Sequence, residues 1–488
     1  MTPAWWSVAR AGVVVLAGTA LAYTAVEVPG TVNLAPAMER ADLSALSSAA
    51  VATASLSCPG PETEGLPGVP AVAATTTVYA SAPPAQVLGD QGAAAGSLTV
   101  TSSPSNSPVG HTDQSGTLVE GPLSGPSVGL VRASGSLAPG VAALQTAVAT
   151  TGDDRAAVTT PCVEARPELW LVAGGGGSTR RERVVLTNPG ANPVSADVSV
   201  LGSNGRLPSA NGQHVSVPAH GRASLLVDAL VGPESTPVVH VVATGGVLTG
   251  VTEDSWVDGA IGRGADDAIP SAAPATEQVI PAVYLDGPAR LRVAVPGGDE
   301  AIVQARALTP DGPTALRGDG VLRVAGGSVG ELDLADVPPG AYAMQVRADQ
   351  PIVAGVMAER RPGGKKQSDF GWTTGTAPVP VLAGSPVPPE ASASLMLVAT
   401  GDAASATVYT ISGTGAVEVH SYALGADSVA DVDVSNARQV WIRQQAGTIR
   451  AGLALNLADA ADEPLFSLVP INPGLVSTTQ VPVRQVPG

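Results

Sequence analysis

Basic residues are scarce in this chain. Its 488 residues include 25 lysines and arginines against 42 acidic residues, which gives a net charge of −17. Only two of the basic residues are lysines, Lys365 and Lys366. A protein that binds nucleic acid needs a basic face that displaces counterions from the phosphates. The composition therefore excludes nucleic acid as a partner.

Aromatic residues are also rare, at 3% of the chain, although 44% of the residues are hydrophobic. Alanine, valine and leucine supply most of that fraction, so the predicted core is aliphatic. Small side chains bury little area each, and we therefore expect domains of modest individual stability.

Cysteine is limited to Cys58 and Cys162. Two cysteines alone cannot form a structural zinc site. An even number of cysteines in an exported chain predicts a disulfide, and two buried free thiols are the alternative. The predicted bond joins residues 104 positions apart and would close a whole domain.

The N-terminus provides the indication of export. Ala11–Val26 is a run of sixteen uncharged residues that follows Arg10. The Arg10 side chain can reach the membrane interface with its charge, and Trp5–Ala9 then lengthen the apolar run enough for a membrane anchor. In that case the C-terminal region lies outside the cytoplasm. Ala20-Leu-Ala22 also offers a signal-peptide cleavage site. Both interpretations place most of the chain outside the membrane, either anchored or secreted.

A pattern recurs about every hundred residues. Three apolar, strand-like stretches share a central glycine at Gly250, Gly355 and Gly452, at steps of 105 and 97 residues. This period is too long for a helical solenoid or a propeller blade, and it suits one small β-sandwich per copy.

The segments between these glycines alternate in polarity and end in Gly, Pro or Asn-Gly turns, as strands do. We therefore predict an all-β chain of tandem immunoglobulin-like β-sandwich domains after an N-terminal membrane segment. The predicted boundaries are 1–27 for the anchor or signal peptide, 28–57 for a juxtamembrane linker, 58–165, 166–275, 276–380 and 381–475 for four β-sandwich domains, and 476–488 for a C-terminal tail.

Two segments match the G-x-S-x-G nucleophile motif, around Ser127 and Ser328. The motif requires a helix directly after the serine, which then stands on a strained turn. Strand-like residues follow both serines here, so we predict that neither is a nucleophile and that the protein is not an enzyme.

The sequence contains no recognisable metal-binding or phosphate-binding motif. None of the histidines has a metal-binding spacing; they are His111, His214, His220, His240 and His420. The acidic segment Glu253–Asp267 lacks the EF-hand pattern and is predicted to be a solvated linker, with calcium binding as the alternative. Gly174–Gly177 lacks the Gly-Lys-Ser/Thr of a phosphate loop. We predict no catalytic residue, no metal and no cofactor.

Several residues together resemble a known family. They are Cys58-Pro-Gly-Pro61, Pro161-Cys162 ahead of Trp170 and a glycine-rich stretch, and Leu186-Thr-Asn-Pro-Gly190 before a valine-rich strand. This arrangement resembles an uncharacterised actinobacterial family of exported proteins with a domain of unknown function, DUF5719. The resemblance implies an envelope location and a β-rich ectodomain, and it carries over no catalytic residue.

The functional hypothesis is a non-catalytic cell-envelope protein that binds a partner or acts as a spacer. The partner is an unidentified envelope protein or glycan, and the N-terminal segment contacts the membrane. The alternatives are a glycan-binding module array and a cell-wall hydrolase. Sugar binding needs exposed aromatics, and the tryptophans beyond the anchor occur about once per predicted domain, as repeated core or junction residues would; they are Trp170, Trp256, Trp372 and Trp441.

Overall fold

The computed structural model describes residues 47–61, 74–88, 95–125, 127–152, 155–176, 179–360, 367–457 and 465–480. The chain forms two compact units, Met1–Ala49 with Thr479–Gly488, and Ala50–Thr478. Two strands near the ends of the described chain, β1 (Ser47–Ala50) and β35 (Ser477–Gln480), pair with each other. All other described elements belong to the unit Ala50–Thr478.

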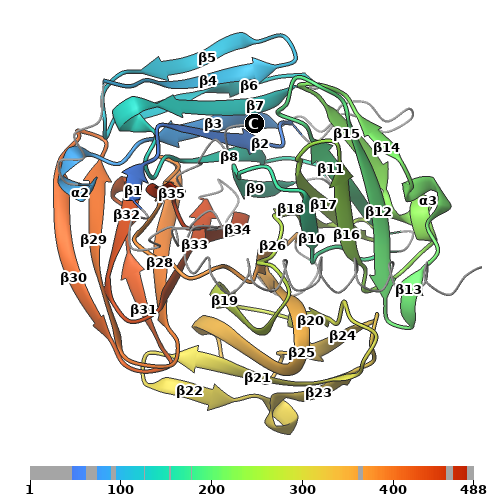
Figure 1. Cartoon of the computed structure of the whole chain (residues 1–488). Coiled ribbons are helices and arrows are strands. Elements are labelled where there is room, and N and C mark those ends of the chain that lie inside the picture. The colour runs from blue at the N-terminus through green and yellow to red at the C-terminus, as the bar shows by residue number, and fades with distance from the viewer. Residues whose placement is uncertain are drawn as a thin grey trace, which may run out of the picture. The chain divides into compact units, whose positions relative to one another are not determined.

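Nearly every element of this unit is a β-strand, and every paired ladder is antiparallel (Figure 1). The strand β12 (Val194–Gly202) shows why. Val194, Ala196, Val198 and Val200 are buried, while the residues between them are half-buried. Side chains of a strand alternate between its two faces, so this spacing directs the valines of β12 toward a core. The prediction of an all-β chain is confirmed.

The strands form four modules, which we number along the chain. Module 1 contains β2 (Thr53–Cys58), β3 (Thr75–Ser81), the helix α2 (Ala85–Leu88), β4 (Leu98–Ser103), β5 (Ser107–Thr112), β6 (Leu118–Leu123), β7 (Val128–Ser134), β8 (Ala142–Ala149) and β9 (Ala156–Pro161). Its sheets have the orders β2-β7-β4-β5 and β6-β3-β8-β9, and a hydrophobic cluster draws on strands of both.

Module 2 contains β10 (Glu168–Leu171), β11 (Arg180–Thr187), β12, β13 (Gly205–Leu207), the 3-10 turn η3 (Ala210–Gly212), β14 (Val215–Val217), β15 (Arg222–Leu226), the helix α3 (Val227–Val231), β16 (Val238–Thr244), β17 (Thr249–Asp258) and β18 (Ile261–Ala268). Its sheets are β10-β16-β12-β13, with β14 also on β12, and β15-β11-β17-β18.

Module 3 contains β19 (Ala275–Leu285), β20 (Ala289–Ala294), β21 (Ala301–Thr309), β22 (Gly312–Ala315), the turn η4 (Arg317–Gly320), β23 (Val321–Val324), β24 (Val329–Asp333), β25 (Gly340–Arg360) and β26 (Asp369–Thr374). The long strand β25 pairs with β19 and β21 through its first half and with β20 and β26 through its second half. It therefore joins the strands of this module into one eight-stranded sheet.

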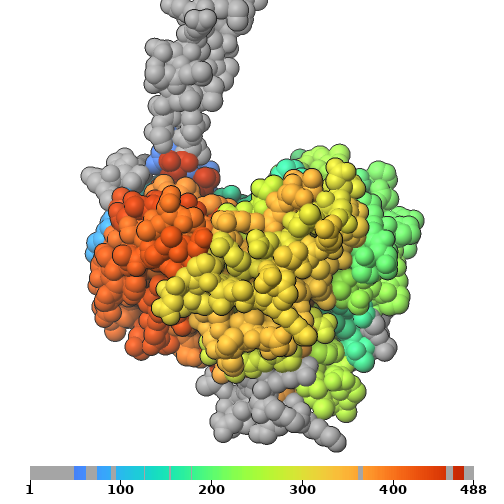
Figure 2. Space-filling model, turned by 90° about the horizontal axis from the view of Figure 1, so that it is seen from below, coloured from blue at the N-terminus to red at the C-terminus, as the bar shows by residue number. Residues whose placement is uncertain are grey.

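Module 4 contains β27 (Leu382–Pro386), β28 (Ala391–Ala399), β29 (Ala404–Ser412), β30 (Val417–Leu424), β31 (Ser428–Asp433), β32 (Ala437–Ala446), β33 (Ile449–Leu457) and β34 (Leu465–Ile471). Its sheets are β27-β32-β29-β30 and β31-β28-β33-β34. In Figure 2, module 3, in yellow, has module 4, in orange, on one side and module 2, in green, on the other.

The modules close on one another through one strand from each. Neighbouring contacts run from β9 to β18, from β18 to β26, from β26 to β34, and from β34 back to β9. We call these four strands the hub (Figure 1). Almost every residue of the hub strands is buried, because both faces of each strand are covered by protein. The first and fourth modules are therefore in direct contact, and the four modules share one interior.

The glycines of the sequence repeat lie in β17, β25 and β33, each of which immediately precedes a hub strand. Two of them lie against the module before their own. A Cβ on Gly355 would approach the carbonyl of Val172 to 3.0 Å, and a Cβ on Gly452 would lie 2.6 Å from the Cβ of Ala282. The missing side chain thus allows close packing between successive modules.

Two segments differ from the predicted organisation. Residues 53–57, predicted as linker, form most of β2, because Leu56 and Cys58 alternate into the core of module 1. The segment Glu253–Asp267, predicted as a solvated acidic linker, is a β-hairpin of β17 and β18 whose acids at 253, 254, 266 and 267 are buried. The linker prediction for Glu253–Asp267 is wrong, because partners on other strands bind those carboxylates.

Candidate functional site

The hub contains a carboxylate that joins three modules. Asp369 begins β26 and is fully buried. Its Oδ2 accepts hydrogen bonds from the backbone N–H of Ala157 in β9, at 3.0 Å, and of Phe466 in β34, at 2.9 Å. Its Oδ1 accepts one from the N–H of Phe370 at 3.0 Å. One side chain of module 3 therefore holds the backbones of modules 1 and 4.

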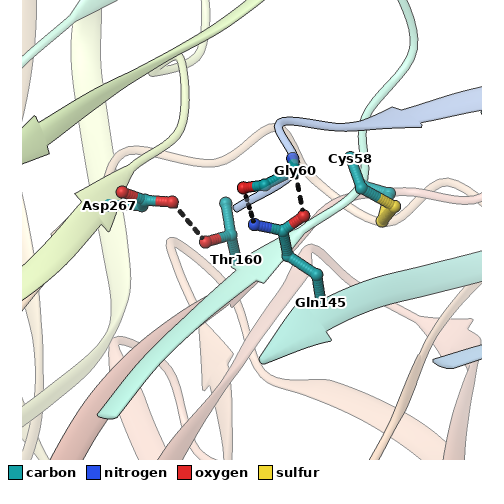
Figure 3. The surroundings of a disulfide bond; sticks show 6 residues. Cys58, Gly60, Gln145, Thr160 and Asp267 are labelled. Carbon is teal, nitrogen blue, oxygen red and sulfur yellow. Dashed lines mark hydrogen bonds between the residues drawn. A yellow bond between two sulfur atoms is a disulfide. The ribbon is translucent and has the colours of Figure 1, made fainter. Parts of the chain in front are cut away.

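Two adjacent acids of β18 extend this network. Asp266 accepts hydrogen bonds from the N–H of Trp372 in module 3, at 2.6 Å, and from the hydroxyl of Ser467 in module 4, at 3.2 Å. Asp267 accepts one from the hydroxyl of Thr160 in module 1, at 2.8 Å (Figure 3). Its other oxygen has no hydrogen-bond partner. Module 2 is thus bonded to each of the other three.

Burial controls the ionisation of these acids. Loss of solvent raises the pKa of Asp266 and of Asp369 well above the ordinary value, although backbone N–H groups oppose the shift. Burial raises the pKa of Asp267 to about 7, against the lowering effect of the Thr160 hydroxyl. A neutral acid is the less costly state in an interior of low polarity. These groups therefore act as hydrogen-bonding links between modules.

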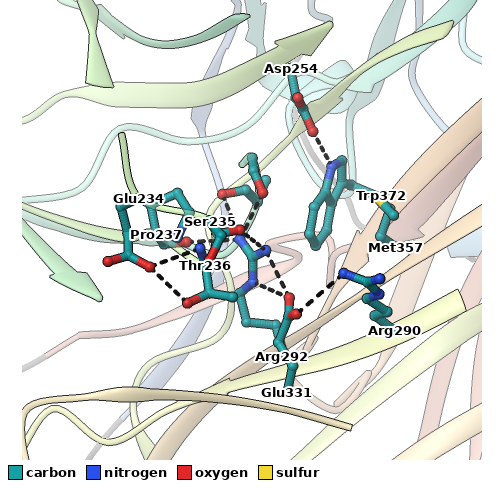
Figure 4. A network of polar contacts seen from close by, with 12 residues as sticks. Glu234, Ser235, Thr236, Pro237, Asp254, Arg290, Arg292, Glu331, Met357 and Trp372 are labelled. Carbon is teal, nitrogen blue, oxygen red and sulfur yellow. Dashed lines mark hydrogen bonds and ion pairs between the residues drawn. The ribbon is translucent and has the colours of Figure 1, made fainter. Parts of the chain in front are cut away.

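A second polar centre lies between modules 2 and 3 (Figure 4). The Arg292 side chain of β20 is buried and forms an ion pair with Glu331 of β24 at 2.8 Å. The same guanidinium donates to backbone carbonyls of module 2, at 2.9 to 3.3 Å; they belong to Ala173, Gly174, Ser235 and Pro237. It also lies 5.1 Å from the ring centroid of Trp372. Arg292 therefore fastens module 3 to two loops of module 2.

Arg180 and Asp254 form a buried ion pair beside that centre, and the indole N–H of Trp372 donates to Asp254 at 2.8 Å. Glu182 is the third acid here. Both of its oxygens are buried without a hydrogen-bond partner, and its carboxyl group lies against Gly174. Burial, followed by the nearby charge of Asp254, raises the pKa of Glu182 well above the ordinary value. A neutral Glu182 is consistent with the absence of a partner.

The polar groups of these centres pair with one another. The arginines are paired with acids and carbonyls, and the carboxyl groups of Asp266 and Asp369 accept hydrogen bonds from backbone amides. Among the described residues, no three His, Cys, Asp or Glu side chains are placed to hold a metal ion. One hollow, lined by Leu56, Pro161, Glu164 and Pro470 among others, has a volume of about 70 Å³, and another, lined by Ser55, Pro189 and Val247 among others, has a volume of about 290 Å³.

The predicted disulfide is confirmed. Cys58, at the end of β2, is bonded to Cys162, just after β9, with the two Cα atoms 4.3 Å apart (Figure 3). Both cysteines belong to the core of module 1. Beside them, the Gln145 side chain exchanges two hydrogen bonds with the backbone of Gly60. The bond thus fixes the first strand of the module to its hub strand.

The two serines of the G-x-S-x-G matches are turn residues. The Ser127 hydroxyl donates to the carbonyl of Ser124 at 2.6 Å, and Ser328 donates to Ala325 at 2.7 Å. Ser428 of module 4 makes the same bond to Gly425 at 2.8 Å. A strand, not a helix, follows each serine. The two motif matches therefore mark turns before β7 and β24, and the turn before β31 has the same serine-to-carbonyl bond without the motif.

The histidines lie apart from one another. His111, His214 and His420 are exposed, and His214 and His220 have left-handed backbone conformations in turns. His240 stacks on Trp170 with ring centroids 3.9 Å apart and lies 2.8 Å from Glu168. Burial lowers the pKa of His240, and the Glu168 contact opposes that effect.

The four tryptophans among the described residues do not form an exposed platform. Trp170, Trp372 and Trp441 are buried, and Trp256 is half-buried. Trp170 belongs to a hydrophobic cluster shared by modules 2 and 3, and Trp441 to one shared by modules 1 and 4. They therefore act as junction residues.

Some predicted features lie outside the described residues. These are the segment Ala11–Val26, the lysines Lys365 and Lys366, and Gly177 of the glycine-rich loop. Within the described ranges, no helix is long and apolar enough to cross a bilayer. The carbonyl of Gly174, in the same loop, accepts a hydrogen bond from Arg292 at 2.9 Å.

Sequence reasoning missed Asp369 and Arg292. A usable signal was present for Asp369, which is the single charge of β26 in a chain with only 14% charged residues, whereas β20 carries Arg290 as well as Arg292. Charged residues are almost never fully buried unless they are paired. An isolated charge in such a strand therefore indicates a partner on another element.

Comparison with known protein families gives a match for this chain. Residues 118–435 match a family described as "Family of unknown function (DUF5719)". The chain belongs to this family. No curated protein matches it.

Eight solved chains are detectably similar. A crystal structure of Thermotoga maritima 1070 is 17% identical, with a TM-score of 0.18, and the match covers 21% of this chain and 93% of that one. A tetra-tandem repeat from the extending region of a large adhesion protein is 14% identical, with a TM-score of 0.10, and the match covers 79% and 91%. These scores are too low to indicate a shared fold.

Proposed function

We propose that this protein is a non-catalytic cell-envelope protein whose four modules, as immunoglobulin-like β-sandwiches, form one rigid scaffold for binding. The hub is the observation that carries the proposal. Asp266, Asp267 and Asp369 join strands of all four modules through buried hydrogen bonds. Such a network resists separation of the modules, because each broken bond leaves a buried polar group without a partner.

The closed arrangement favours a scaffold over a linear spacer. Modules 1 and 4 are in contact through β9 and β34 and through β8 and β27, so the ends of the series meet. The loops and edge strands at the periphery remain as contact surfaces. The partner class is an envelope protein or a glycan.

The location rests on two observations. The disulfide Cys58–Cys162 is typical of an oxidising, extracytoplasmic compartment. The uncharged run Ala11–Val26 fits an uncleaved anchor or a signal peptide. We therefore place the unit Ala50–Thr478 outside the cytoplasmic membrane, anchored or secreted.

Three measurements test this proposal. Protease added to intact, wall-stripped cells should digest the modules, and full protection of module 4 would contradict the location. A fluorophosphonate probe should fail to label the full chain. Labelling that disappears in Ser127→Ala or Ser328→Ala would favour the hydrolase alternative. Recovery of chains beginning at Tyr23 would show cleavage of a signal peptide instead of an anchor.

A further inference from the structure

One sheet of module 4 ends in a long, uninterrupted strand. In the described part of the chain β30 pairs with β29 alone, along the whole of Val417–Leu424 and without a register shift (Figure 1). Residues 418–421 are exposed, and Val419, at 53%, is the most exposed large hydrophobic side chain among the described residues. The side of β30 that faces away from β29 is therefore open to solvent.

The other modules shorten or block the corresponding end strand, which likewise follows its partner in the chain. Module 2 divides it into β13 and β14, of three residues each, and module 3 divides it into β22 and β23, of four residues each. In module 1 the strand β5 contains Pro108, which has no N–H, and its register with β4 shifts. Short strands, prolines and bulges keep an exposed edge from pairing with another chain. Of these end strands, β30 has none of the three features.

The hairpin between β29 and β30 determines which backbone groups of β30 point outward. The N–H of Ser412 donates to the carbonyl of Ala416 at 2.9 Å, so these two residues form the first hydrogen-bonded pair of the ladder. Hydrogen-bonded and non-hydrogen-bonded pairs alternate along an antiparallel ladder. In the register of the two strands, Glu418 and His420 therefore bond to β29. The N–H and C=O of Val419, between them, point away from β29 toward solvent.

Antiparallel pairing of two copies of β30 about Val419 brings complementary groups together. The two Val419 residues then form a hydrogen-bonded pair, and Glu418 of each copy lies opposite His420 of the other, in the pairs whose side chains approach most closely. Within one copy, the Glu418 Oε2 lies 3.8 Å from the His420 Nε2, and these side chains are 76% and 58% exposed. A carboxylate accepts a hydrogen bond from an imidazole N–H. The strand is therefore complementary to itself in side-chain polarity, in apolar contact and in backbone bonding.

We infer that β30 is a dimerisation edge, at which a second copy of this chain adds its own β30 across a two-fold axis at Val419. The contact is isologous, because the same strand serves on both sides, and such a contact closes with two chains. The sheets β27-β32-β29-β30 of the two copies then form one continuous sheet through backbone hydrogen bonds. The scaffold of four modules is thereby presented in pairs. Dimerisation does not depend on the proposed location of the protein.

A crosslink in the purified full chain tests the position of the axis. Val419→Cys places two thiols at the axis, where the Cα atoms of a hydrogen-bonded pair are about 5.5 Å apart, within the range of a disulfide. Mild oxidation should convert this variant into a covalent dimer on a non-reducing gel. Val321→Cys is the matched control, because Val321 lies in the end strand β23 of module 3 and is exposed to a similar extent, at 49%. It should remain monomeric.

Exchange of the polar side chains tests the register. His420→Glu sets a glutamate opposite Glu418 on both sides of the axis, and it should weaken the dimer by about tenfold in sedimentation equilibrium, because like charges directly opposite destabilise a strand pair. His420→Glu combined with Glu418→Lys places unlike charges opposite each other again and should restore the dimer. The thermal midpoints of these variants show that the modules remain folded.

Equal crosslinking of Val419→Cys and Val321→Cys would overturn the inference. So would a dimer that His420→Glu leaves unchanged, or one that the second substitution fails to restore. A wild-type chain that stays monomeric up to roughly 100 µM would leave β30 to a strand of a different protein, and it would also overturn self-association.

Discussion

The carboxylate of Asp369 accepts the backbone N–H of Phe466 at 2.9 Å, across the boundary between modules 3 and 4. The same oxygen accepts the N–H of Ala157 from module 1. A single side chain therefore satisfies backbone donors of two other modules, in a region where water has no access. Its removal should affect the assembly of the modules more than the fold of any one module.

Asp369→Ala should lower the free energy of unfolding by on the order of 3 kcal/mol or more, because it leaves buried amides without acceptors. Urea unfolding of the full chain measures this. Asp369→Asn, which matches the neutral acid in shape, should cost less. Asp311→Ala removes an exposed carboxylate and should change stability by no more than about 0.5 kcal/mol. A similar loss for Asp311→Ala and Asp369→Ala would contradict the role of the hub.

Arg292 and Arg290 form a matched pair for the centre between modules 2 and 3. Both lie in β20 near Glu331, but Arg292 is buried and Arg290 has 60% of its side chain exposed. Arg292→Ala should destabilise the chain by about 3–5 kcal/mol, because it leaves Glu331 and several carbonyls without a partner. Arg290→Ala should cost about 1 kcal/mol or less. Thermal midpoints of the two variants check this, and equal shifts would show that the buried contacts contribute nothing.

Stability should fall as pH rises from about 4 to about 7. Burial raises the pKa of Asp267 from its ordinary value near 3.8 to about 7 in the folded chain. Between these pH values the folded state keeps a proton that the unfolded state has lost. The contribution of Asp267 to the free energy of unfolding is therefore complete at acid pH and disappears above pH 7. Glu182, Asp266 and Asp369 shift in the same direction.

Asp267→Asn should therefore reduce the dependence of the unfolding free energy on pH between 5 and 8, by an amount on the order of a few kcal/mol. The measurement is a series of urea titrations of both proteins across that range. An unchanged slope in the variant would mean that Asp267 titrates normally in the folded chain.

Loss of the disulfide should destabilise module 1. The bond spans 104 residues, and chain entropy for a loop of this length corresponds to about 4–5 kcal/mol. Cys58→Ser with Cys162→Ser should lower the unfolding midpoint, and dithiothreitol should do the same to the wild-type chain. Mass spectrometry of non-reduced peptides from the native envelope should recover the linked pair. Free thiols there would count against both the bond and the proposed location.

Local patterns in the sequence were sufficient to predict that the chain is built almost entirely of β-strands. Alternation such as Val194–Val200 predicts a strand from neighbouring residues alone, and Gly, Pro and Asn-Gly mark the turns. Two cysteines in a chain predicted to be exported were sufficient to predict the disulfide, because only one pairing exists. The strand-like residues after Ser127 and Ser328 likewise predicted the strands observed there, since the nucleophile motif needs a helix at that point.

Only the tertiary structure determined which residues meet in the hub. Asp369 binds amides 97 and 212 positions away, and Asp267 binds a hydroxyl 107 positions away. The acids of β18 therefore read as a solvated linker in the sequence, although they are buried in the structure. The alternation of residues in the sequence predicts which face of a strand is buried, because it depends only on neighbouring residues. Which strands cover one another depends on how the four modules pack around the hub, and that packing is set by contacts between residues far apart in the sequence.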